Sequence, residues 1–272
     1  MATARIVKSV ALVALLLASA GLFGQACSRA YMQYEAAFIP GRELLDLALW
    51  VVGTASLLVV SGALVAALVR PFWAMAVGFA ASSAAMLVVL GLTRWAGALA
   101  FVYLALSLMY AKSAVADMDN RIAFTVQSFR AGQDTLFLAA AILVAVCMGL
   151  GYREDSTRRG FLLPPAYKQT MMDTVLPVMG SLLPGGGGAG AEELARQGLE
   201  RFWSEIEGRL RPYAEYVPIG FALFFFFVLE TILRLTSWVP PLVLNLLIRL
   251  FAVVGMTRVV TQTTEVRRLV LS

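Results

Sequence analysis

Long apolar segments separated by short polar ones make up most of the chain. A helix needs about 20 mainly apolar residues to cross the ~30 Å hydrocarbon core of a bilayer. Seven segments approach or exceed this length, and each predicts a helix: 10–26, 47–69, 72–92, 95–111, 136–151, 217–235 and 239–256. The pattern therefore predicts an all-α fold, a multi-pass transmembrane helical bundle of six or seven helices.

The first apolar segment allows three interpretations. Arg5 and Lys8 precede it, and the small residues Ala18, Ser19 and Ala20 resemble a cleavage site, which is typical of a secretory signal peptide. Cys27 allows a lipoprotein anchor, although the Leu that is usual three positions upstream of such a Cys is missing. The third interpretation is a helix that is retained in the bundle.

One sizeable polar region, 152–216, divides the chain. It separates an N-terminal transmembrane region of up to five helices, 1–151, from a C-terminal transmembrane hairpin, 217–257, and a short basic tail, 258–272. Within it, four consecutive glycines at 185–188 indicate a flexible joint, because no Lys follows them to complete a phosphate-binding loop.

The segment 191–211 follows the glycine joint and predicts an amphipathic helix that Pro212 terminates. Its apolar residues recur every three or four positions and so share one face of that helix: Ala195, Leu199, Phe202, Trp203, Ile206 and Leu210. An apolar face must be covered by something. We expect it to lie on the bilayer interface, to pack on the protein's own helices, or to dock a partner.

Few charged residues fall inside the apolar segments, and a charge at bilayer depth is costly. Glu230 and Arg234 are four residues apart and share a helical face. If the last two segments fold into a hairpin about 237–238, Asn245 falls opposite Glu230, and Arg249 lies one turn deeper. The four residues then form a cluster, either an ion or proton site or a neutralised pair that pins the hairpin. The pair is favoured, because Arg does not release its proton.

Composition agrees with a lipid-embedded chain and narrows its chemistry. Of 272 residues, 60% are hydrophobic and 14% are charged, with a mean hydropathy of +0.79, whereas soluble domains are about 25% charged. The absence of His removes His-ligated haem and His-based zinc and triad chemistry. Cys147 lies in an apolar segment far from Cys27, which favours buried free thiols over a disulfide. We therefore expect no cofactor and no metal.

The distribution of Lys and Arg predicts an orientation. If all seven segments span, fourteen basic residues lie on the side of 152–216 and the tail, and seven lie on the other side. The positive-inside rule then places the large polar region and the C-terminus in the cytoplasm, beneath a bacterial inner membrane. The same count leaves Arg5 and Lys8 outside, a conflict that six spans would remove. The modest net charge of +5 indicates anchoring to the membrane rather than nucleic-acid binding.

The sequence carries no catalytic or nucleotide-binding motif. We therefore expect a non-catalytic integral membrane protein, a scaffold or assembly subunit of a bacterial envelope or secretion apparatus. Its expected partners are the lipid bilayer and either another protein or a second copy of the chain. The alternative is a small-solute or ion transporter or channel that uses the polar cluster in the last two helices.

Overall fold

The computed structural model describes residues 2–39, 41–69, 71–120, 127–160, 162–182 and 189–253. Within these ranges every regular element is helical. The elements in chain order are α1 (Ala2–Met32), the 3-10 helix η1 (Tyr34–Phe38), α2 (Arg42–Leu68), α3 (Phe72–Leu90), α4 (Arg94–Asn120), α5 (Gln127–Arg159), α6 (Pro165–Leu182), α7 (Ala189–Leu210), the 3-10 helix η2 (Arg211–Tyr213), α8 (Val217–Leu235) and α9 (Val239–Val253). The glycine joint at 185–188 and the basic tail at 258–272 lie outside the described residues.

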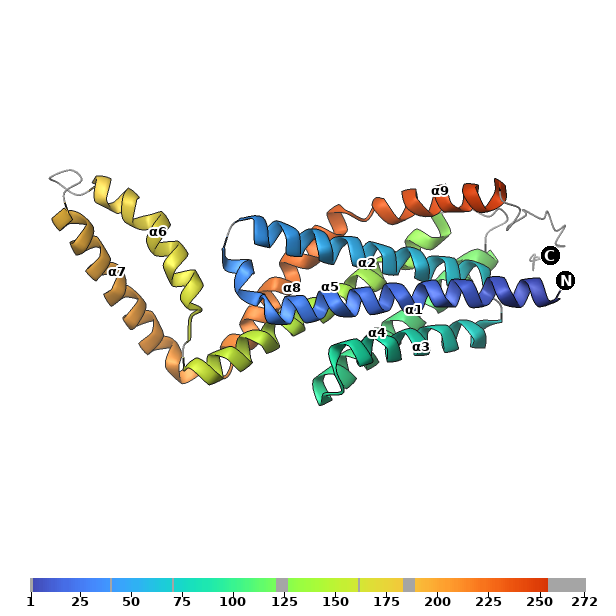
Figure 1. Ribbon diagram of the computed structural model, residues 1–272, viewed down its shortest axis with the longest axis horizontal. Coiled ribbons are helices and arrows are strands. Elements are labelled where there is room, and N and C mark those ends of the chain that lie inside the picture. Colours follow the sequence, from blue (N-terminus) through green and yellow to red (C-terminus); the bar gives the residue numbers. More distant parts are fainter. Residues whose placement is uncertain are drawn as a thin grey trace, which may run out of the picture.

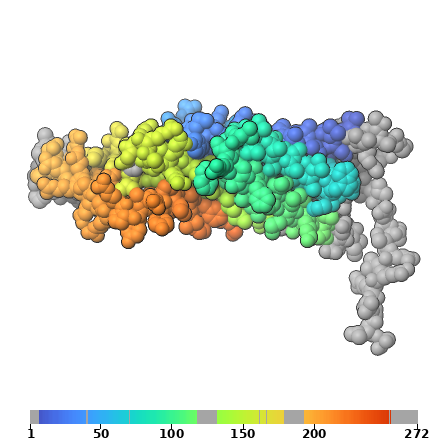
Figure 2. All heavy atoms as spheres, turned by 90° about the horizontal axis from the view of Figure 1, so that it is seen from below, coloured from blue at the N-terminus to red at the C-terminus, as the bar shows by residue number. Residues whose placement is uncertain are grey.

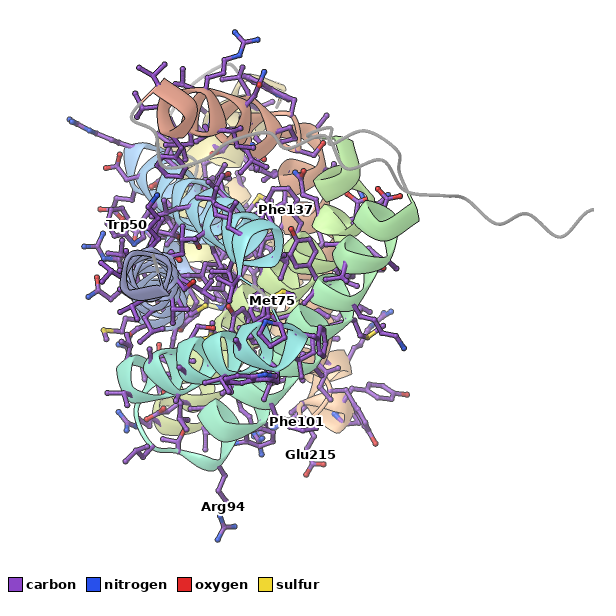
Figure 3. All side chains as sticks on the ribbon, turned by 90° about the vertical axis from the view of Figure 1, so that its right-hand side faces the viewer. Trp50, Met75, Arg94, Phe101, Phe137 and Glu215 are labelled. Atoms are coloured by element: carbon purple, nitrogen blue, oxygen red, sulfur yellow. The ribbon has the colours of Figure 1, made fainter. Side chains whose placement is uncertain are left out.

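Helices α1 to α5 run alternately in opposite directions and form an elongated bundle (Figure 1). α1 contacts α2, α3 and α5, and its side chains at Leu16, Ala20 and Phe23 have no exposed area. In a view along the bundle, Met75 lies among the helices, whereas Phe101 points outward (Figure 3). The depth at which α1 is packed supports the interpretation of the first apolar segment as a helix of the folded bundle.

The predicted all-α class is confirmed. Among the described residues, six helices are long and apolar enough to cross a membrane: Val7–Met32, Arg42–Leu68, Phe72–Leu90, Arg94–Asp117, Gly132–Arg159 and Val217–Leu235. The seventh predicted segment forms α9, whose apolar part, Val239–Phe251, is shorter. Large apolar side chains also remain on the outside of the bundle, such as Trp73 and Val88 at 67% and 72% exposure. Such an outer surface suits contact with lipid.

α5 extends two turns beyond the predicted segment 136–151. Its last turns carry ion pairs between residues four apart, Glu154 with Arg158 and Asp155 with Arg159, which support an exposed helix. Gly160 then ends the helix, because its φ of 70° is one that glycine adopts without strain. The helix therefore continues into the first residues of the polar region 152–216.

Two glycines of α5 allow neighbouring helices to approach closely. A Cβ atom added at Gly149 would lie 2.7 Å from the Cβ of Ala222 on α8, and one added at Gly151 would overlap the carbonyl oxygen of Tyr31 on α1. Such contacts are shorter than any that real Cβ atoms make, so only glycine fits at these positions. α5 is thereby held between α1 and α8.

Buried hydroxyl groups connect the helices inside the bundle. The Ser19 and Ser61 hydroxyls are 2.6 Å apart between α1 and α2. Between α3 and α4, the Ser83 hydroxyl donates to the carbonyl of Ala100 at 2.7 Å, and the Ser82 and Tyr103 hydroxyls are 3.1 Å apart. The Ser19, Ser61 and Ser82 hydroxyls also bond to carbonyls of their own helices, so these buried polar atoms have partners both within and between helices.

α6 and α7 pack against each other and project from one end of the bundle (Figures 1 and 2). We call this helix pair the arm, and the end to which it is attached the arm end. α7 confirms the helix predicted for 191–211, and η2 with Pro212 follows directly after it. α6 corresponds to a part of the polar region in which no helix was predicted. It also contains Pro177 within the helix.

The predicted C-terminal hairpin is not formed. α8 packs along α5, whereas α9 continues in much the same direction and packs along α2 (Figure 1). The N–H of Ser237 bonds to the carbonyl of Arg234, and that of Val239 to the carbonyl of Thr236. These bonds keep the link turning in the helical sense, and Gln133 of α5 donates to the Ser237 carbonyl at 2.7 Å. A link of this kind bends the chain without reversing it, so α9 ends opposite the arm.

Candidate functional site

The four polar residues expected to cluster do not come together. Glu230 pairs with Arg234 at 2.5 Å, as predicted from their spacing. Asn245 and Arg249 lie on the exposed surface of α9, which runs away from α8 instead of folding back beside it. The Arg234 side chain is 70% exposed and that of Glu230 21%. The pair therefore lies on the outer surface of α8.

The apolar face predicted on α7 mostly covers α6. Ala195 is buried, at 4% exposure, and Leu199, Trp203, Ile206 and Leu210 are partly buried. Phe202, at 53% exposure, is the member of the face that points away from this contact. Packing on the protein's own helix, one of the three expected roles, thus accounts for most of the face.

Tyrosines at the end of α1 and in η1 bind the acidic residues at the end of α5. The Tyr31 hydroxyl donates to a carboxylate oxygen of Glu154, and the Tyr34 hydroxyl donates to Oδ2 of Asp155 at 2.6 Å. Burial of Tyr34, together with its bond to Asp155, raises the pKa of the phenol far above its usual value. The hydroxyl therefore stays protonated and remains a donor to α5.

Further polar contacts attach the arm to the bundle. The Tyr152 hydroxyl of α5 donates to the carbonyl of Leu162, just before α6. Within the arm, Lys168 of α6 pairs with Glu207 of α7, and both side chains are less than one third exposed. An ion pair that is partly shielded from water holds its geometry better than an exposed one.

An aromatic cluster surrounds these contacts and reaches from the bundle into the arm. Tyr152 stacks on Phe221 of α8 with ring centroids 5.0 Å apart, and Phe38 of η1 also stacks on Phe221, at 5.1 Å. Phe38 also meets Tyr167 of α6 at 5.5 Å, and Tyr167 meets Trp203 of α7 at 5.8 Å. We call this set the junction, and it joins α5, η1, α8, α6 and α7: Tyr34, Phe38, Tyr152, Tyr167, Trp203 and Phe221.

Two cavities lie at the arm end, and Tyr152 of the junction lines the second of them. The first, of about 720 Å³, lies between α1, the α3–α4 turn and α5, and we call it the arm-end cavity. The second, of about 740 Å³, lies between the end of α5, η2 and the start of α8. Arg153 and Thr157 of α5 line both cavities. Both volumes fall in the range of about 300–1,000 Å³ that is typical of ligand sites.

The sulfur chemistry follows the expectation from sequence. Cys27 and Cys147 are both buried and both free, and they lie on α1 and α5, which pack against each other. Within the described ranges, no group of three or more Cys, Asp or Glu side chains is arranged to hold a metal ion.

The residues that the sequence did not single out are Tyr31, Tyr34, Tyr152 and Arg153. They lie at the junction and at the two cavities, and the signal available in the sequence was the dense run of charges at 153–159 next to a tyrosine. No protein-family model, no curated protein and no solved structure matches this chain. The local geometry is therefore the basis for any statement about function.

Proposed function

We propose that the chain is a non-catalytic, multi-pass integral membrane protein that acts as a scaffold or assembly subunit in a bacterial envelope, with the arm as its docking element. The observation that carries the proposal is the arm itself. It projects beyond the bundle, and the junction fixes its base by hydrogen bonds and stacked rings instead of a loose linker. An element held in this way presents its surface in a defined direction.

The surface of the arm suits a protein partner. Val178, Leu194 and Phe202 are 58%, 68% and 53% exposed, although each is a large apolar side chain. Around them α7 carries ion pairs on its outer side, Arg196 with Glu200 and Arg209 with Glu205. Aromatic anchors within a polar rim are typical of protein interfaces.

A photo-crosslinking experiment in cells tests this role of the arm. Benzoylphenylalanine placed at Phe202 or Leu194 should give one discrete adduct of higher mass, whereas the same group at Phe224, which is 62% exposed on α8, should react with lipid and give none. The adduct from position 194 should disappear in Phe202→Glu and persist in Arg201→Glu, a matched change on the same helix. The absence of a discrete adduct from either arm position would contradict the proposal.

The membrane placement and orientation need a separate test. We propose that the arm lies in the cytoplasm. α9 ends at the bundle end opposite the arm, so we propose that the chain leaves α9 on the other side of the membrane from the arm, and not on the same side as the count of basic residues predicts. In a variant without Cys27 and Cys147, thiols introduced at Ser204 and Thr264 should react with an impermeant maleimide from opposite faces of sealed vesicles. Labelling from the same face would overturn the six-crossing topology, and release of the protein by alkaline carbonate would overturn the membrane placement.

A further inference from the structure

The arm-end cavity owes its position to the unequal lengths of the helices around it. α3 ends at Leu90 and α4 begins at Arg94, whereas α5 continues to Arg159 and passes the α3–α4 turn toward the arm (Figure 1). In the space-filling view, the end of α5 (yellow-green) adjoins the α3–α4 region (teal) on one face of the molecule (Figure 2). The cavity therefore opens where the short helical hairpin α3–α4 stops and α5 continues.

The lining of the cavity changes from apolar to charged along its length. Leu90, Leu99 and Leu150 line it from α3, α4 and α5, and Trp95 lies beside the α3–α4 turn. The charged lining residues, Arg153, Glu154 and Arg158, all come from the last turns of α5, beyond the level at which α3 ends. Trp side chains are enriched at the boundary between hydrocarbon and headgroups, so the cavity crosses that boundary from one side to the other.

The charges at this mouth do not balance. Glu154 is occupied twice, since it accepts the Tyr31 hydroxyl and pairs with Arg158. Asp155, the next acid on α5, is taken by Tyr34 and Arg159. Within the described part of the chain no ion pair is recorded for Arg153. Two arginines and one carboxylate leave a net charge of +1 at the mouth, next to an apolar interior.

We propose that the arm-end cavity binds one anionic phospholipid from the surrounding leaflet, with an acyl chain among Leu90, Leu99 and Leu150 and the headgroup phosphate on Arg153. A phospholipid carries a charged headgroup directly next to its acyl chains. The charged and apolar parts of the cavity lining adjoin in the same way, so one lipid molecule can contact both. The guanidinium of arginine donates to phosphate through charge-assisted hydrogen bonds. This inference rests on the membrane placement proposed above and is independent of the arm's partner.

Native mass spectrometry of the full-length protein tests the proposal. Protein equilibrated in detergent micelles that contain equal amounts of phosphatidylglycerol and phosphatidylcholine should retain one phosphatidylglycerol per chain in preference to phosphatidylcholine. Arg153→Gln should weaken retention of phosphatidylglycerol about tenfold, the loss expected for one charge-assisted bond. Arg159→Gln is the matched control, because Arg159 lies on the same helix, pairs with Asp155 and does not line the cavity. Arg153→Lys should keep most of the preference.

A second variant tests the hydrocarbon part of the site. Ala96 is 4% exposed and lines the cavity from α4, so the larger side chain of Ala96→Leu should occupy part of the space for an acyl chain and lower retention of both lipids without changing the charge. The proposal is overturned if phosphatidylglycerol and phosphatidylcholine are retained equally, or if Arg159→Gln weakens retention as much as Arg153→Gln. It is equally overturned if inorganic phosphate alone raises the melting temperature as much as the lipid does, since the ligand would then be a soluble anion. The crosslinks from the arm should be unchanged in Arg153→Gln, which separates failure of this site from failure of the docking proposal.

Discussion

The contact between Gly149 of α5 and Ala222 of α8 gives the sharpest test of the fold. Two carbon atoms attract best at about 3.5–4.0 Å, whereas a Cβ at position 149 would lie 2.7 Å from the Cβ of Ala222 and 3.2 Å from the carbonyl of Pro218. Gly149→Ala therefore forces α8 outward by about 1 Å. Overpacking of this kind costs about 1–3 kcal/mol, and the better helix propensity of Ala offsets about 1 kcal/mol of it. We expect a net loss of up to about 2 kcal/mol.

Ala222→Gly provides the compensating change. Alone it should destabilise the protein by about 1 kcal/mol, because glycine lowers helix propensity. Combined with Gly149→Ala it moves the methyl group from α8 to α5 and removes the overlap. The double variant should thus be more stable than the sum of the single changes predicts, by a coupling of about 1–3 kcal/mol.

Reversible unfolding in mixed micelles, followed by circular dichroism over a titration with dodecyl sulfate, measures the four free energies of this cycle. Gly220 lies on the same helix as Ala222, and no atom lies within 4 Å of a Cβ added there. Gly220→Ala is therefore the control and should not destabilise the protein. Single changes that add within about 0.5 kcal/mol would refute direct packing of Gly149 on Ala222.

Three further predictions concern polar contacts. Ser61→Ala should lower the stability in micelles by about 0.6 kcal/mol, and by no more than about 1.7 kcal/mol, which is the range for one hydrogen bond between membrane helices. Adding Ser19→Ala to this variant should lower the stability little further, because the two hydroxyls share one bond. Glu230→Gln should lower the melting temperature more than Glu230→Gln with Arg234→Gln, since the single change leaves Arg234 unpaired; the opposite order would show that the pair does not act as a unit. The raised pKa of Tyr34 means that the folded state holds its proton more tightly, so stability is complete below the unfolded pKa of about 10 and declines as the pH rises above it. Tyr34→Phe should flatten this decline when melting temperatures are compared at pH 9 and pH 11, and an unchanged slope would contradict burial of the phenol.

The hydrophobic pattern predicts the helices of the bundle well, because each one faces an apolar environment along most of its length. The segment 217–235 coincides with α8. α1 and α5 continue several residues beyond the segments 10–26 and 136–151. The hydrophobic pattern does not reveal the C-terminal extension of α5, because that part of the helix lies outside the apolar core. It is completed instead by ion pairs between residues four apart and by a glycine at its end.

The arrangement of helices at the arm was beyond what the sequence pattern determines. α6 contains Pro177 and a mixed polar pattern, so its helicity depends on packing against α7 rather than on local propensity. The pattern predicted an apolar face on α7 that something must cover, whereas α6, which packs against α7, is an element that the pattern did not predict. In the same way, the bonds that continue the helical turn through 236–239 decide against a hairpin, and no hydrophobic period encodes them.

The candidate site illustrates the same limit at the level of single residues. Tyr34 and Asp155 are 121 positions apart in the chain and meet only because α1 and α5 end at the same level of the bundle. That meeting occupies Asp155, just as Tyr31 and Arg158 occupy Glu154, and it leaves Arg153 as the charge available at the cavity mouth. The tyrosine contacts that bind α1 and η1 to the end of α5 therefore also set the charge at the mouth of the arm-end cavity. A change that releases Tyr31 from Glu154 should weaken the preference for an anionic headgroup, since the freed carboxylate would compete for Arg153.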